Sequence, residues 1–144
     1  MAENCPIRIF SVDDHPLFRE GIATVIKSQP DMVLVADAAN GVEALQRFRE
    51  HRPDVTLMGL RLPGSSGLDT TIAIRTHFPE ARVILVSTYQ SDLDLQNALQ
   101  AGAWGHIFKT MPTRQMVDII RQVHAGRKCV APPAVTRLAG RPGR

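Results

Sequence analysis

The sequence has few cysteines and no long apolar stretch. Its two cysteines, Cys5 and Cys129, lie near opposite ends and match neither a metal-ligand spacing nor a redox pair, which excludes a disulfide framework and a cysteine zinc site. Two such thiols are typical of a reducing compartment. No apolar run approaches the roughly 18 residues of a membrane span, and the start lacks the cationic and apolar regions of a signal peptide. We therefore expect a cytoplasmic protein without membrane contact.

Acidic residues are absent after Asp118, whereas five of the 17 basic residues follow Gly126. The formal charge of the whole chain is +3, but residues 1–126, the body of the chain, contain 12 basic and 14 acidic side chains. The body therefore has a formal charge of −2. A body of this charge does not favour nucleic-acid binding. Residues 127–144 show little periodicity, and we expect them to form a linker or disordered basic tail after a single domain at 1–126.

Short β-branched runs alternate with amphipathic stretches along the body. The runs predict strands, and apolar residues at helical spacing between them predict helices. Asn40 is an expected N-cap of the second helix, and Pro112 is expected in the first turn of the last. The expected strands are 7–12, 32–36, 55–58, 82–86 and 107–108. The expected helices are 17–26, 40–52, 68–77, 92–99 and 110–123.

This alternation predicts a fold of the α/β class, a doubly wound five-stranded parallel sheet in one domain. Parallel neighbours need crossover connections, and these are right-handed. We expect the flavodoxin-like strand order 2-1-3-4-5, in which strands 1 and 3 are neighbours. Asp13, Asp14 and Gly59 should then converge at the switch point of the sheet, where ligands bind in such folds.

Residues with chemical function follow several of the expected strands. Asp13 and Asp14 are adjacent carboxylates that repel each other unless a cation neutralises them, and Mg²⁺ prefers such oxygen ligands. One of the two acids could instead cap the following helix. Ser87 ends strand 4 and Lys109 ends strand 5, so a hydroxyl and an ammonium should reach the same sheet edge. Both are suitable partners for phosphoryl oxygens.

With these residues in place, the sequence resembles the CheY-like receiver domain of two-component response regulators over residues 7 to about 126. The opening Asp-Asp-His-Pro-Leu-Phe-Arg-Glu-Gly-Ile is similar to the subgroup of LuxR/NarL-type transcriptional regulators. The motifs that carry the resemblance are Val12 to Pro16, Pro53-Asp54, Leu60 to Gly64, Gly67-Leu68, Ser87, Ala101 to Ala103 and Phe108-Lys109.

The resemblance implies roles for individual residues. Asp13 and Asp14 would be the acids of a Mg²⁺ site, with the backbone carbonyl of Arg61 as a further ligand. Ser87 would be the switch hydroxyl, and Lys109 would contact the phosphoryl group.

Two positions depart from the family pattern. Gly59 stands where the family has the aspartate that accepts the phosphoryl group, so the chain should be unable to accept it. The missing carboxylate should also weaken Mg²⁺ binding. His106 stands where the family often has a rotameric Tyr or Phe at the switch site. The site is otherwise intact, which favours a recent or laboratory substitution at position 59 over a natural loss; the intact residues are Asp13, Asp14, Ser87 and Lys109.

The resemblance implies a signalling module and not an enzyme. Its partner would be a sensor histidine kinase, with homodimerisation as an option, and DNA would be bound only through an output domain that this chain lacks. An alternative is a natural phosphorylation-independent pseudo-receiver that acts as a docking adaptor. A phosphatase or a flavin protein on the same fold is a further alternative, but no Cys or third carboxylate is expected in the crevice, and the acid pair would repel a flavin phosphate.

Overall fold

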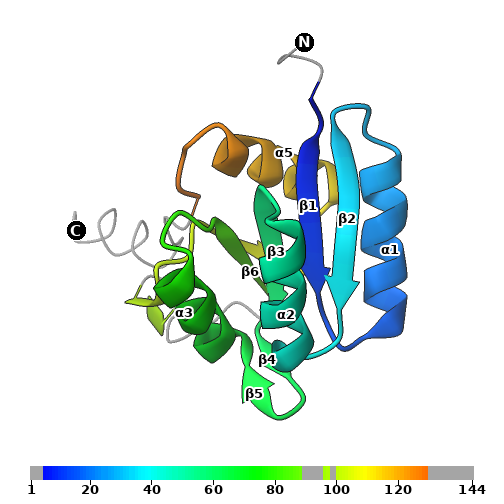
Figure 1. Ribbon diagram of the computed structural model, residues 1–144. Helices are drawn as coiled ribbons and strands as arrows, with labels where there is room; N and C mark the ends of the chain where they lie inside the picture. Colours follow the sequence, from blue (N-terminus) through cyan, green and yellow to red (C-terminus); the bar gives the residue numbers. More distant parts are fainter. Residues whose placement is uncertain (1–4, 89–95, 98–99, 130–144) are drawn as a thin grey trace, which may run out of the picture.

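A five-stranded parallel sheet forms the centre of the molecule (Figure 1). The computed structural model describes residues 5–88, 96–97 and 100–129. The strand order β2-β1-β3-β6-β7 confirms the predicted 2-1-3-4-5 order, counted within this sheet. Its strands are β1 Ile7–Val12, β2 Met32–Ala38, β3 Val55–Gly59, β6 Val83–Ser87 and β7 Gly105–Phe108.

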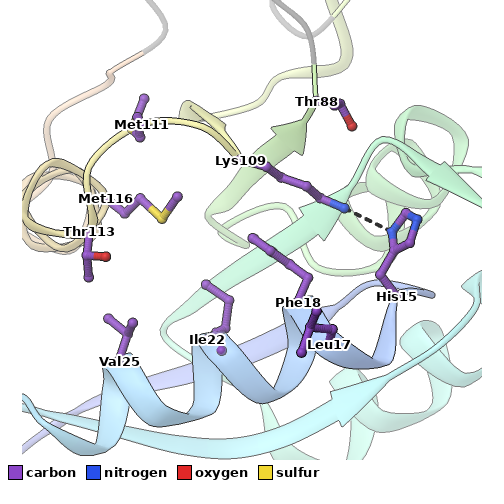
Figure 2. Close-up of a pocket in the computed structure, with 11 residues that line it drawn as sticks. His15, Leu17, Phe18, Ile22, Val25, Thr88, Lys109, Met111, Thr113 and Met116 are labelled. Carbon is purple, nitrogen blue, oxygen red and sulfur yellow. Dashed lines mark hydrogen bonds between the residues drawn. The ribbon is translucent and has the colours of Figure 1, made fainter.

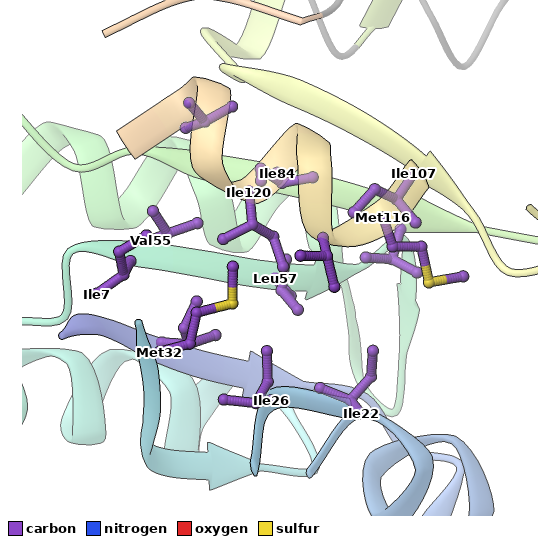
Figure 3. Packing of buried hydrophobic residues seen from close by; sticks show 14 residues of the cluster. Ile7, Ile22, Ile26, Met32, Val55, Leu57, Ile84, Ile107, Met116 and Ile120 are labelled. Atoms are coloured by element: carbon purple, nitrogen blue, oxygen red, sulfur yellow. The ribbon is translucent and has the colours of Figure 1, made fainter. Parts of the chain in front are cut away.

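Buried side chains alternate between the two faces of the sheet, as the pleat of a strand requires. In β6, Ile84 and Val86 belong to one hydrophobic cluster, and Val83 and Leu85 belong to the other. Figure 3 shows the first cluster, in which the sheet packs against two flanking helices. Both faces are covered, which explains why the predicted strands are nearly continuous apolar runs.

In the part of the chain that the structure describes, the four helices given below are divided equally between the two faces of the sheet. Helices α1 and α5 contribute to one hydrophobic cluster, and α2 and α3 to the other, with α2 and α3 in front of the strands in Figure 1. Asn40 caps α2 as predicted, because its side chain accepts a hydrogen bond from the Glu43 N–H at 2.9 Å. The helix expected at 92–99 lies largely outside the described residues. No helix in the described part is long and apolar enough to cross a membrane. The helices are α1 Pro16–Lys27, α2 Gly41–His51, α3 Gly67–His77 and α5 Thr113–His124.

A small hairpin after β3 was not predicted from the sequence. Strand β4, Arg61–Leu62, pairs in antiparallel orientation with β5, Ser65–Ser66. Gly64 has a φ of +78° in the connecting turn, a conformation that glycine adopts without steric cost. The hairpin carries the chain from the carboxyl edge of the sheet into α3.

Gly67 begins α3 directly against the end of β3. Its N–H donates to the carbonyl of Leu60 at 2.7 Å. A Cβ atom at position 67 would collide with the backbone carbonyl oxygen of Gly59. The absence of a side chain at Gly67 therefore lets α3 start close to the strand end.

The chain after α5 returns to the sheet. The Cys129 N–H donates to the carbonyl of Trp104 at 2.6 Å, and Cys129 forms a parallel bridge with Gly105 in the outer strand β7. Burial raises the pKa of the Cys129 thiol. Residues 127–129 are thus attached to the domain, and the remainder of the expected tail lies outside the described residues.

An ion pair connects the start of β2 to α5 and should make stability depend on pH. Arg121 donates to both Asp31 carboxylate oxygens, at 2.8 and 2.9 Å, and these hydrogen bonds hold the pKa of Asp31 below its usual value. The resulting stabilisation is present above the unfolded-state pKa of about 4 and is lost as the pH falls through the lowered pKa.

We therefore expect Arg121→Gln to lower the free energy of unfolding at pH 7. Both side chains are more than two-fifths exposed, so the loss should be about 0.5 kcal/mol. Urea denaturation of both proteins at pH 7 and at about pH 2.5 measures the difference. A difference that persists unchanged in acid would contradict the assignment to this pair.

Candidate functional site

The carboxyl ends of four strands meet around a crevice with a volume of about 220 Å³. Asp13 follows β1, Gly59 ends β3, Ser87 ends β6 and Lys109 follows β7. All four residues line this crevice, so the sheet brings together groups that are up to 96 positions apart in the sequence. Its further lining residues are His15, Leu60, Arg61, Val86 and Thr88.

Asp13 is the buried charge of the crevice, with only 2 % of the residue exposed. Its Oδ2 lies 3.0 Å from the Lys109 ammonium, and its Oδ1 accepts the backbone N–H of His15 at 2.8 Å. Arg19 donates to the Asp13 carbonyl at 2.6 Å. The Lys109 ammonium and the His15 N–H therefore compensate a carboxylate that burial alone would penalise, while Arg19 binds the backbone of the same residue.

Asp14 and His15 complete an acidic cluster at the crevice rim. The His15 Nδ1 lies 3.0 Å from Asp13 Oδ1 and 3.4 Å from Asp14 Oδ1. One ligand atom of each of these three residues lies within 4.8 Å of the others. Neither carboxylate caps α1, whose N-cap is His15 without a side-chain cap bond, so the capping interpretation is wrong for both.

Gly59, at the end of β3, faces Asp13, which follows the directly neighbouring strand β1. A Cβ at position 59 would lie 3.1 Å from Asp13 Oδ2 and 3.1 Å from the carbonyl oxygen of Val12. A side chain there would point at the buried carboxylate after shifts of a few tenths of an ångström. Asp54 lies at the other end of the strand, where it accepts the Arg8 N–H at 2.9 Å, so it does not reach the crevice.

Ser87 joins the crevice to a buried histidine. The Ser87 Oγ lies 2.8 Å from His106 Nε2, and both residues are at least 94 % buried. The His106 ring packs against Phe108 with a centroid separation of 4.6 Å. His106 therefore contacts the crevice through Ser87 and does not line it.

A second, apolar cavity of about 590 Å³ adjoins the crevice between α1 and the start of α5 (Figure 2). Lys109 and His15 line both cavities, and their Nζ and Nδ1 atoms lie 3.0 Å apart. The Lys109 ammonium also lies 4.6 Å from the centre of the Phe18 ring. Leu17 is 82 % exposed at the rim of this cavity.

The structure brings together the residues that the sequence singled out at the strand ends. Arg61 is also present, at the start of β4, whereas sequence reasoning assigned no role to His15 or Arg19. The adjacency of His15 to two acids in the sequence was the available signal. Its side chain is 66 % exposed but contacts both acids and Lys109.

Comparison with known proteins identifies the family. The family described as "Response regulator receiver domain" matches residues 9–121, which include all four strand-end residues of the crevice. The chain belongs to the response regulator receiver domain family.

Relatives place this receiver among LuxR/NarL-type regulators. The structure of a LuxR-family two-component response regulator from Aurantimonas is 34 % identical with a TM-score of 0.87, and covers 96 % of this chain and 99 % of that one. The receiver domain of NarL from Mycobacterium tuberculosis is 32 % identical with a TM-score of 0.82, over 85 % of this chain and 99 % of that one. Oxygen regulatory protein NreC from Staphylococcus epidermidis is 38 % identical over 92 % of this chain. The aligned part covers 61 % of the length of NreC.

Proposed function

We propose that this receiver domain cannot accept a phosphoryl group, because Gly59 occupies the position of the family's acceptor aspartate. The supporting observation is that Gly59 ends β3 inside the crevice, with its Cβ direction aimed at Asp13 Oδ2 from 3.1 Å. Ser87 and Lys109 line the same crevice. A glycine has no oxygen with which to form an acyl phosphate, so the partners of the reaction are present without the nucleophile.

The residues of the crevice fit a Mg²⁺ ion. Asp13 and Asp14 offer carboxylate oxygens close together, and the Arg61 carbonyl is the further ligand that we propose. The place beside the Asp13 carboxylate already holds the positive charge of Lys109 at 3.0 Å. A bound Mg²⁺ would neutralise charge on phosphoryl oxygens. Without a carboxylate at Gly59 the site has one ligand fewer, and Mg²⁺ should bind more weakly.

The remaining side chains would hold the domain in its unphosphorylated arrangement. Lys109 is paired with Asp13, and Ser87 is hydrogen-bonded to His106. A phosphoryl group at position 59 would compete for both Lys109 and Ser87, and His106 would respond through its bond to Ser87. Because Gly59 cannot carry a phosphoryl group, no phosphoryl oxygen would compete for the Lys109–Asp13 ion pair or the Ser87–His106 hydrogen bond.

In a longer protein this receiver would be the regulatory part of a transcription regulator. We propose a sensor histidine kinase as its partner, DNA contact only through an output domain outside this chain, and a homodimer as the assembled form. These proposals rest on the 38 % identity to NreC and the 34 % identity to a LuxR-family regulator. A phosphorelay of this kind operates in the cytoplasm.

A second candidate function is a phosphorylation-independent pseudo-receiver that acts as a docking adaptor. The apolar cavity of about 590 Å³ between α1 and α5 favours it, together with the exposed Leu17 at its rim. The intact Asp13, Ser87 and Lys109 favour a recent or laboratory replacement of an aspartate at position 59 instead. An aspartate codon at position 59 of the native gene would show a laboratory replacement, and a glycine codon would show a natural one.

Calorimetric titration with Mg²⁺ and beryllofluoride tests the proposed site. We expect the present chain to bind Mg²⁺ at least about tenfold more weakly than Gly59→Asp, since one ligand is missing, and to show no heat from beryllofluoride. Gly59→Asp should bind both. As a control, Asp54→Asn removes a carboxylate at the opposite end of β3 and should change neither titration. Tight beryllofluoride binding by the present chain would contradict the proposal.

A further inference from the structure

The imidazole of His15 has the geometry of a metal ligand. Its Nδ1 lies 3.0 Å from Asp13 Oδ1 and 3.4 Å from Asp14 Oδ1. Two neighbouring ligands of an octahedral ion with bonds of 2.0–2.1 Å are about 3.0 Å apart. The His15 nitrogen is therefore spaced from the Asp13 oxygen as a neighbouring ligand would be, and the donor atoms of Asp13, Asp14 and His15 all lie within 4.8 Å of one another.

A positive charge already contacts two of these three residues, His15 and Asp13. The Lys109 ammonium lies 3.0 Å from His15 Nδ1 and 3.0 Å from Asp13 Oδ2 (Figure 2 shows the contact with His15). Asp13 is 98 % buried, so one ligand is fixed by the fold. The His15 side chain is 66 % exposed and can adjust to an ion without repacking the core.

We propose that His15 is a third side-chain ligand of the cation site, and that its nitrogen makes the site prefer Co²⁺, Ni²⁺ or Zn²⁺ to Mg²⁺. This inference rests on the proposed function, which places the cation at Asp13 and Asp14. Imidazole suits these transition metals, whose affinity for mixed nitrogen and oxygen sites exceeds that of the harder Mg²⁺. The glycine at position 59 strengthens the preference, because a site short of one carboxylate depends more on its nitrogen donor.

Metal titrations of the purified chain test the assignment of His15. Calorimetry with CoCl₂ and MgCl₂ measures affinity, and the visible absorption of bound Co²⁺ reports its ligands. We expect His15→Ala to weaken Co²⁺ binding at least about tenfold and to change the Co²⁺ spectrum, while Mg²⁺ affinity changes less than about threefold. The control is His77→Ala, which removes an exposed histidine at the end of α3 and should alter neither.

The outcomes separate this inference from the proposed function. Unchanged Co²⁺ affinity and spectrum in His15→Ala would overturn the role of His15. If Asp14→Asn still weakened Mg²⁺ binding in that case, the proposed cation site would stand. If the chain bound neither ion, the cation site and the role of His15 would both fail, while the proposal that Gly59 prevents phosphorylation would stand. His15 and Asp14 are exposed, and circular dichroism of each variant verifies that the fold is retained.

Discussion

Replacing Gly59 with aspartate is expected to turn a chain that acetyl phosphate does not label into one that it labels at that residue. The new carboxylate would extend from the end of β3 toward Asp13, beside Lys109 and Ser87. Mg²⁺ and the Lys109 ammonium would stabilise the charge that develops during transfer. Intact-protein mass spectrometry measures the gain of one phosphoryl group, and loss of the label in hydroxylamine identifies an acyl phosphate.

The matched control for this experiment is Gly59→Asn. Asparagine has nearly the shape of aspartate but no carboxylate oxygen to attack phosphorus, so it should remain unlabelled. A response in Gly59→Asp alone would assign the missing chemistry to one side chain. Stable labelling of the present chain would contradict the proposal, and peptide mapping to Asp13 or Asp14 would then identify the alternative acceptor.

Gly67→Ala is expected to have the largest effect on stability. Its Cβ would collide with the backbone carbonyl oxygen of Gly59, and it would lie 3.0 Å from the Cα of Leu60. Backbone atoms cannot rotate away as a flexible side chain can, so α3 must shift relative to the end of β3. Overpacking of this kind costs about 1–3 kcal/mol, and we expect the upper end of that range. Urea denaturation measures the loss.

Gly21→Ala provides the internal comparison. Gly21 lies within α1, and a Cβ there would meet no atom within 4 Å. The same substitution should therefore stabilise the protein by about 0.5–1 kcal/mol, because alanine is the better helix former. Equal effects of the two substitutions would show that Gly67 is not held against β3 as the structure places it.

The architecture could be predicted because local patterns and connection rules agree. β-Branched runs such as Ile7–Val12 specified the central strands, and the parallel crossovers then limited the strand order. That order alone was sufficient to place Asp13, Ser87 and Lys109 at one edge. The fold prediction and the site prediction therefore depended on the same evidence.

The exact ends of helices and strands, and contacts between residues far apart in the sequence, were not predictable in the same way. The last helix begins at Thr113 and not at Thr110, because the residue before Pro112 is pushed out of the helical region. β7 begins earlier than predicted, at Gly105, whose lack of a side chain allows Ile84 and Val123 to approach. The contact of Lys109 with His15 spans 94 residues and has no local pattern.

The bridge between Cys129 and Gly105 also bears on aggregation, because it lies at an outer edge of the sheet. β7 is an outer strand of the sheet, and unpaired outer strands are templates on which other chains add strands and aggregate. Cys129 occupies part of that edge with the chain's own backbone. The return of the chain after α5 thus helps to keep the sheet from growing at β7.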